Sequence, residues 1–248
     1  MNKQLLLRFE GPLMSFGGPV VDNYGVTNRY PSLSMITGLI GNALGYDHRE
    51  TDKLQNLQNG LEYAVRCDIA GPIVKDYQTV DLGLQYMSDS NAWTTRGEIE
   101  KRAGGNSSET HIRFREYIAD SVYTLAVGLK ESYSRLTLED LKSALTCPAR
   151  PLFIGRKCCI PSVDVFLGEC FAKTPIAALR EWPRSERDEH CKKLEVWWFG
   201  DKDPETSKDV IQLSGFDERD WVNQIHCGRR RVWYGHIDPP KAGDHEKE

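Results

Sequence analysis

The sequence has no hydrophobic run long enough to cross a membrane. Its longest apolar stretches, such as residues 5–7 and 123–127, fall far short of the roughly 20 residues that a transmembrane helix needs. The N-terminus also lacks the apolar segment of a secretory signal, because Arg8 interrupts its short leucine run. We therefore expect a cytoplasmic protein with no membrane partner.

The cysteines do not form any recognisable framework. There are 7 of them, an odd number, and none forms a C-x-x-C pair. Disulfide scaffolds favour even counts in small secreted chains, and zinc sites favour closely spaced ligands. His190-Cys191 and His226-Cys227 are adjacent pairs, a spacing that seldom ligates one metal well. We expect reduced thiols, with no metal and no cofactor.

Common enzyme signatures are missing as well. The sequence has no Walker A motif, no G-x-G-x-x-G after a strand and no G-x-S-x-G elbow. Its acidic residues gather in polar stretches that are typical of solvated surfaces. Because no arrangement of residues demands a reaction, we expect a protein that is not an enzyme.

What remains is the composition of an ordinary globular protein. The chain has 248 residues, of which 40% are hydrophobic, and 32 Lys and Arg against 36 Asp and Glu give a formal net charge of −4. This length supports one large domain or two modest ones. The acidic balance argues weakly against a general nucleic-acid coat but leaves room for a local basic surface.

The hydrophobic pattern predicts an α+β fold. Helices are expected after a Ser34 N-cap and at residues 52–58 and 138–145, the last opened by a capping box at Thr137, and strands at 4–9, 61–69, 115–129 and 151–154. The order strand, helix, strand, insertion, strand, helix, strand is that of a ferredoxin-like βαββαβ unit.

The character of the sequence changes near residue 170. We expect a ferredoxin-like domain over residues 1–170, a smaller, mostly β region over 171–238 and a loose tail over 239–248. The C-terminal region has a charged stretch at 180–209 around an apolar island, followed by two expected strands at 210–213 and 230–237.

A long, weakly apolar segment, residues 75–113, interrupts the predicted first domain. Segments of this kind are usually functional or mobile. From Trp93 to Arg115, just past the end of this segment, there are three acids and five basic residues, namely Arg96, Lys101, Arg102, Arg113 and Arg115. An extended hairpin with this composition can follow phosphates and place an aromatic ring between bases, although a solvated surface loop has the same composition.

Two further places could bind phosphate. Arg156-Lys157 follow a predicted strand and a glycine, where they would contact phosphate or protect a sheet edge. Arg29, Ser32 and Ser34 precede the first helix, whose free N–H groups would attract an anion; a simple cap and ion pair is the alternative. In that helix Gly38, Gly41 and Gly45 indicate close approach of another segment or of a partner.

Three groups of motifs carry a family resemblance. Residues 9–17 read FEGPLMSFG, residues 29–34 read RYPSLS and lead into GLIGNALG at 38–45, DYQTV at 76–80 precedes Arg115-Glu116-Tyr117, and residues 150–159 read RPLFIGRKCC. In this order and spacing they resemble the RAMP-superfamily CRISPR subunits of the CasD family, which bind the crRNA 5′ handle in the type I-E Cascade complex. The resemblance covers roughly residues 4–170.

The resemblance implies a fold and a function. Members have an RRM-like ferredoxin domain with an inserted thumb β-hairpin, here at about residues 78–112. They are RNA-binding parts of a cytoplasmic ribonucleoprotein for antiviral defence, and they contact the handle and the first spacer nucleotides. Their protein partners are the backbone RAMP subunits and the large PAM-reading subunit, and they meet target DNA indirectly.

The RNA-binding residues that follow from the composition and the resemblance together are Arg29, Ser32, Ser34, Gly38, Gly41, Trp93, Arg96, Lys101, Arg102, His111, Arg113, Arg115, Arg156 and Lys157. Sequence specificity toward the target would come from base pairing, while the protein holds the shape of the RNA backbone.

Two other functions stay open. Relatives in another CRISPR type cut precursor RNA without metal, and here Tyr30, Tyr46 and His111 would be the catalytic residues of such an endoribonuclease. No adjacent Lys-His dipeptide occurs in the chain, however, and type I-E systems delegate cutting to a separate subunit. The second is an interaction scaffold whose Arg-rich thumb binds an acidic protein.

Overall fold

The computed structural model describes residues 1–18, 20–21, 23–81, 92–93, 99–100, 110–130, 132–133, 135–185, 187, 193–203, 205 and 209–240. In this part of the chain, one large, mostly antiparallel sheet of ten strands is combined with four helices. The expected α+β class is therefore confirmed. None of the described helices is both long enough and apolar enough to span a membrane.

Four strands form the centre of the sheet. They are β1 (Asn2–Met14), β4 (Leu61–Ile69), β8 (Thr110–Leu129) and β9 (Phe166–Ala172), and they lie side by side in the order β9-β1-β8-β4. Each neighbouring pair is antiparallel. Leu5, Leu6 and Leu7 are all fully buried, because both faces of the sheet are covered at this point.

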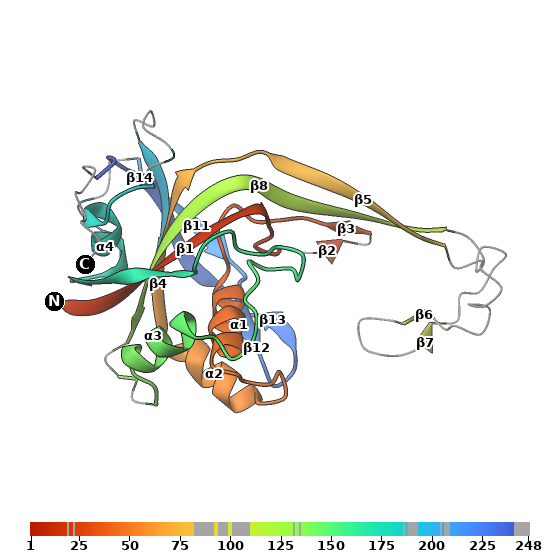
Figure 1. Cartoon of the computed structure of the whole chain (residues 1–248), viewed down its shortest axis with the longest axis horizontal. Helices are drawn as coiled ribbons and strands as arrows, with labels where there is room; N and C mark the ends of the chain where they lie inside the picture. The colour runs from red at the N-terminus through yellow and green to blue at the C-terminus, as the bar shows by residue number, and fades with distance from the viewer. Residues whose placement is uncertain are drawn as a thin grey trace.

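Helices cover both faces of this centre (Figure 1). On one face, α1 (Leu33–Ala43) and α3 (Leu138–Thr146) pack on alternate residues of β1 and β8, and α2 (Thr51–Gly60) packs beside α1. On the opposite face, α4 (Pro175–Glu181) packs over Leu6, Ala64 and Ala126. The even and odd residues of a strand thus belong to two separate hydrophobic cores.

The C-terminal region continues the same sheet. Beyond β4 the order runs through β10 (Leu194–Phe199) and β14 (Arg230–Ile237) to β11 (Ile211–Gly215). A separate small hairpin, β12 (Glu218–Asp220) with β13 (Ile225–Cys227), lies against α1 and α2. The expected boundary at residue 170 falls inside β9, and the division into domains stays a prediction.

The N-terminal half of β8 extends out of the body of the protein as an arm (Figure 1). There β5 (Ile73–Asp81) pairs antiparallel with β8 along its whole length. On the other edge of β8 lies the short β3 (Tyr24–Gly25), which is parallel to β8 and pairs in turn with β2 (Val20–Val21). Most of the expected thumb, including Arg96, Lys101 and Arg102, lies outside the described residues; of its interior, β6 (Ala92–Trp93) pairs with β7 (Ile99–Glu100).

Two local expectations were wrong. Residues 151–154 do not form a strand but part of a loop. The Ile154 N–H donates to the Cys159 carbonyl at 2.8 Å, the Ile154 carbonyl accepts the Ser15 N–H at 3.1 Å, and Gly155 turns the chain with φ of 99°. The fourth central strand is instead β9, whose pattern is weakened by Gly168 and Glu169. The cap of α1 is Ser32 rather than Ser34, since the Ser32 Oγ accepts the Met35 N–H at 3.1 Å.

A buried ion pair joins the sheet to α4. Arg66 is fully buried and donates from Nε to the Asp68 carboxylate at 2.5 Å. Its remaining donors reach the backbone carbonyls that follow α4, at 2.7 Å for Trp182 and 2.9 Å for Pro183. The hydroxyl of Thr124 in β8 donates a further hydrogen bond to the Asp68 carboxylate at 2.5 Å. Each charge is compensated, so the cost of its burial is offset by several hydrogen bonds.

Removing one partner of this pair should be costly. We expect Asp68→Asn to lower the free energy of unfolding by about 3–5 kcal/mol, because the Arg66 charge would stay buried without a counter-charge. Urea unfolding followed by circular dichroism measures this change. Glu62→Gln, at an exposed position of the same strand, is the control and should have almost no effect. Equal unfolding midpoints for the two variants would contradict the role given to Arg66.

Candidate nucleic-acid interface

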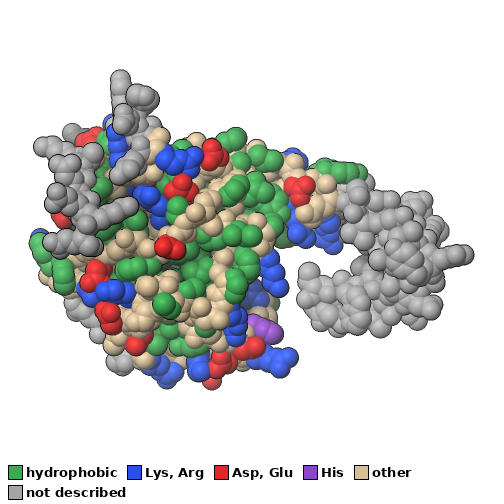
Figure 2. Space-filling view, viewed as in Figure 1, with side chains coloured by type: hydrophobic (Ala, Val, Ile, Leu, Met, Phe, Trp, Pro, Cys, Tyr) green, Lys and Arg blue, Asp and Glu red, His purple; other side chains and the backbone are tan. Residues whose placement is uncertain are grey.

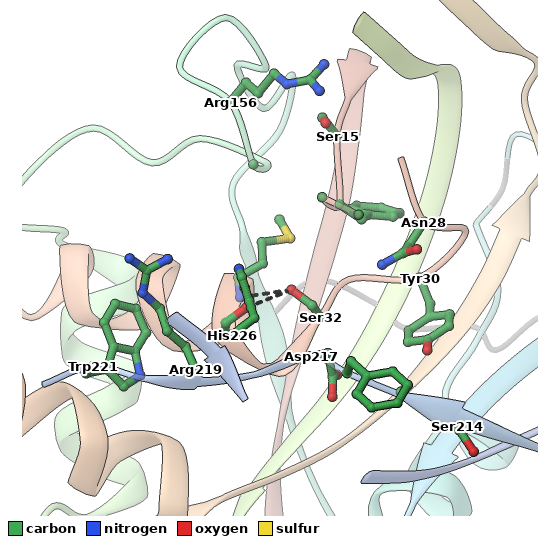
Figure 3. Close-up of a pocket in the computed structure, with 18 residues that line it drawn as sticks. Ser15, Asn28, Tyr30, Ser32, Arg156, Ser214, Asp217, Arg219, Trp221 and His226 are labelled. Carbon is green, nitrogen blue, oxygen red and sulfur yellow. Dashed lines mark hydrogen bonds between the residues drawn. The ribbon is translucent and has the colours of Figure 1, made fainter. Parts of the chain in front are cut away.

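A groove lies where four segments meet near the start of α1. Its lining comes from residues 15–18, from residues 28–35, from the turn at Gly155-Arg156 and from the C-terminal residues 214–226. Figure 3 shows these segments converging on one hollow, with Arg156 on one side and Arg219 and Trp221 on another. The volume of the groove is about 730 Å³, within the range of about 300–1,000 Å³ that is typical of ligand sites.

The start of α1 forms the floor of the groove, and its backbone donors are already occupied. The N–H groups of Leu33 and Ser34 donate to the side chain and the backbone oxygen of Asp217, at 3.0 and 3.1 Å. The next two N–H groups donate to the side chain and the backbone oxygen of Ser32. The expectation of free N–H groups was therefore wrong: the carboxylate of Asp217 takes the place that a bound anion would have at this helix end.

Asp217 is itself held by an arginine of β14. Arg230 donates from Nε and Nη2 to the two carboxylate oxygens of Asp217, at 3.1 and 2.5 Å. The guanidinium lies over the ring of Phe199, 3.7 Å from its centroid, and also donates to the hydroxyl of Tyr63 at 2.9 Å. The C-terminal strands, β4 and the start of α1 are thus joined at one buried carboxylate.

We expect Asp217→Asn to destabilise the protein by about 3 kcal/mol, the lower end for buried pairs because the Arg230 side chain is still 16% exposed. The amide can still accept the Leu33 N–H but leaves Arg230 without a counter-charge. Thermal and urea unfolding measure the loss, with the exposed Asp209→Asn as control. Equal stability of both variants would show that α1 does not depend on Asp217.

A basic surface lies beside the groove, at the base of the arm. A Cβ placed on Gly25 would lie 3.1 Å from Arg156 Nη2 and 3.8 Å from the Arg115 side chain, so the two arginines flank this glycine. Arg156 is held in place by the carbonyls of Glu116 at 2.9 Å and Gly25 at 3.3 Å, and it lies over the ring of Tyr117. Figure 2 shows Lys and Arg side chains gathered where the arm leaves the body.

Two more of the predicted basic residues are near neighbours of Arg115 and Arg156 in the sequence. Arg113 is exposed two residues before Arg115 and therefore points to the same face of β8. Lys157 is exposed directly after Arg156. The structure thus brings Arg115 and Arg156 together and places Arg113 and Lys157 next to them in sequence.

Other predicted residues lie elsewhere. The Arg29 side chain is 73% exposed and faces Glu195 at 3.9 Å. Gly41 is buried, and a Cβ there would lie 2.7 Å from Leu54 of α2, so this glycine serves helix packing and is not exposed to a partner. Gly38 approaches Trp221 at the back of the groove. The side chains of Trp93 and His111 are outside the part of the chain that the structure describes.

Of the residues expected of an endoribonuclease, the two tyrosines lie in the described part of the chain, and the fold does not bring them together. Tyr30 precedes α1 and Tyr46 follows it, so the length of an 11-residue helix, about 16 Å, separates their backbones. Burial, together with the nearby Asp217, raises the pKa of Tyr30 above its ordinary value, which disfavours the phenolate that a general base requires. Among the described residues, no group of three or more His, Cys, Asp and Glu could hold a metal ion.

Sequence reasoning missed the C-terminal wall of the groove. This wall consists of Phe216, Asp217, Arg219, Trp221 and His226. Arg219 and His226 lie opposite each other across the β12–β13 hairpin. Their strands are only three residues long, too short for a periodic pattern, and so the only available signal was the aromatic and basic composition of this stretch.

Comparison with known proteins identifies the family. Residues 4–233 match the family described as CRISPR-associated protein (Cas_Cas5), and the chain belongs to this family. It is similar to the "CRISPR system Cascade subunit CasD" of Escherichia coli (strain K12), with 32% identity over 179 residues that cover 72% of this chain and 76% of the relative. The family resemblance seen in the motifs is confirmed.

Solved structures share the fold. A chain of a "CRISPR RNA-guided surveillance complex" superposes with a TM-score of 0.64 at 23% identity, covering 96% of this chain and 91% of that one. A second structure, "Crystal structure of Cas protein", has a TM-score of 0.58 at 21% identity, with 96% and 95% of the two chains covered. The large sheet with its helices is therefore a fold that this chain shares with both of these structures.

Proposed function

We propose that the chain is a non-catalytic crRNA-binding subunit of a type I-E Cascade complex, where it caps the 5′ handle during antiviral defence. The observation that carries the proposal is the pair Arg115 and Arg156, which flank Gly25 beside a ligand-sized groove in a protein 32% identical to a Cascade subunit. A guanidinium suits phosphate because it is permanently charged and has five N–H donors, of which Arg156 uses two for the carbonyls of Glu116 and Gly25.

The arrangement of the sheet supports a ferredoxin-like domain with a thumb. Taken in chain order, the four central strands β1, β4, β8 and β9 lie in the spatial order fourth, first, third, second, and helices connect the first to the second and the third to the fourth. The β5–β8 ladder then leads outward to residues 82–109, where the thumb would be. On this proposal the thumb crosses the guide where handle meets spacer.

The handle is recognised through shape and unpaired bases. Single-stranded RNA can be bound by phosphate contacts, stacking and hydrogen bonds to base edges, while target sequence is read by base pairing to the guide. Arg113, Arg115, Arg156 and Lys157 would follow the backbone, and the groove would face the handle. The protein partners would be the backbone RAMP subunits and the large PAM-reading subunit, with target DNA met through the guide.

The proposed function predicts a specific loss for Arg115→Ala. We expect the variant to bind handle RNA about 5- to 100-fold more weakly, equivalent to about 1–3 kcal/mol, and the slope of log K against log salt to fall by about 1. Binding is measured by fluorescence anisotropy at several salt concentrations. Arg49→Ala, at an exposed position after α1, is the matched control. Unchanged affinity of Arg115→Ala would remove this residue from the interface.

Purification separates the proposal from its alternatives. We expect co-expression with a CRISPR array and the neighbouring genes, followed by purification through a tag on this subunit, to yield a multisubunit particle with one mature RNA. The chain alone, incubated with precursor RNA without metal, should leave it intact. Cutting that is lost in His111→Ala would establish the endoribonuclease instead, and a particle without RNA would establish the scaffold.

A further inference from the structure

The C-terminal wall gives the groove a ring that contacts solvent. Phe216 lines the groove and is 68% exposed, whereas most aromatic residues of the neighbouring sheet are buried or half-buried. What distinguishes Phe216 from other exposed rings such as Phe171 is its place in the groove, and every nucleobase offers a flat face that stacks on an aromatic ring.

Two basic side chains lie on the same wall. Arg219 and His226 are direct cross-strand neighbours on the β12–β13 hairpin, and both line the groove. The Arg219 guanidinium lies 5.3 Å from the Trp221 ring centroid and donates to Gln224 at 2.6 Å. Among the described residues, no carboxylate lies within ion-pair distance of Arg219 or His226, and Arg219 Nε is buried without a hydrogen-bond partner. This side of the groove therefore suits a phosphate.

The rest of the lining is mixed: Phe16 and Met35 are apolar, Arg156 is basic, and several other residues are neutral and polar. Ser15, Asn28 and Ser214 contribute hydroxyl and amide groups, and Figure 3 shows Asn28 and Tyr30 beside each other on the wall next to β8. The acid of the lining, Asp217, is neutralised by Arg230 and by the α1 backbone. An aromatic face, a cationic side and neutral hydrogen-bonding groups together are the chemistry that one nucleotide requires.

We propose that the groove holds one unpaired nucleotide of the bound RNA, with its base stacked on Phe216 and its phosphate at Arg219 and His226. The inference rests on the proposed RNA-binding function and adds a site on the C-terminal region, which neither the sequence motifs nor the basic surface of the arm include. The phosphates bound at Arg115 and Arg156 lead toward this groove, because Arg156 lines it as well.

The test combines the removal of one base from the RNA with the removal of the Phe216 ring from the protein. The RNA recovered with the purified complex gives the handle sequence, and a series of synthetic handles then carries one abasic nucleotide at each position in turn. We expect one position at which the missing base weakens binding to the wild-type protein about 5- to 100-fold. Phe216→Ala should bind the intact handle with the same loss and lose nothing further when that base is absent.

Phe171→Ala is the matched control, because Phe171 is 63% exposed on the edge strand β9, outside the groove. It should bind like the wild type and keep the full effect of the abasic position. Arg219→Ala should weaken binding at every position of the series, since it removes a phosphate contact and leaves the stacked base in place.

Three results would overturn the inference. These are an even abasic profile for the wild type, equal binding by Phe216→Ala and Phe171→Ala, or loss of protein subunits from the Phe216→Ala complex with RNA affinity intact. If Arg115→Ala weakens binding while Phe216→Ala does not, the nucleotide site is absent and the RNA-binding function stands. If the wild type itself does not bind handle RNA, the proposed function fails.

Discussion

The carboxylate of Asp217 determines how the C-terminal part of the sheet is joined to α1. It accepts the first N–H of the helix and both arms of Arg230, so that β14, β4 and the helix start share one set of hydrogen bonds. A negative side chain at a helix N-terminus is favourable, and its burial is compensated by the arginine. The groove exists because this contact brings residues 214–226 across to α1.

Local patterns predicted the elements that depend on local interactions. The strand at residues 61–69 and the capping box at Thr137 were predicted correctly, since alternation and side-chain caps are readable within a few residues. β9 was missed because its residues are only half-buried and include a glycine. The role of Asp217 could not be predicted from the sequence. Leu33, one partner, is 184 residues away, and Arg230, the other, is one of three consecutive arginines whose charge alone does not reveal which carboxylate it binds. For the same reason Gly41 was taken for a binding residue although it packs against Leu54.

The two faces of the sheet have different tasks. One face carries α1, α2 and α3, together with the groove and the basic surface around Arg156. The other is closed by α4, which the Arg66–Asp68 pair holds through carbonyl groups. A buried charge network on the closed face stiffens the sheet without exposing polar groups to a ligand. The open face can then present its cations on a rigid support, which limits the entropy lost on binding.

β8 connects the centre of the sheet to the arm. It covers 20 residues, and Asp120, with a φ of 48°, interrupts the extended backbone between its two halves. Its second half lies between β1 and β4 in the middle of the sheet, and its first half, paired with β5, forms the arm. A strand paired on both sides cannot slide, because a shift by one residue would turn its buried side chains to the wrong face. The register within the sheet therefore decides which residues of β8 leave the body, and with them the point from which the arm begins.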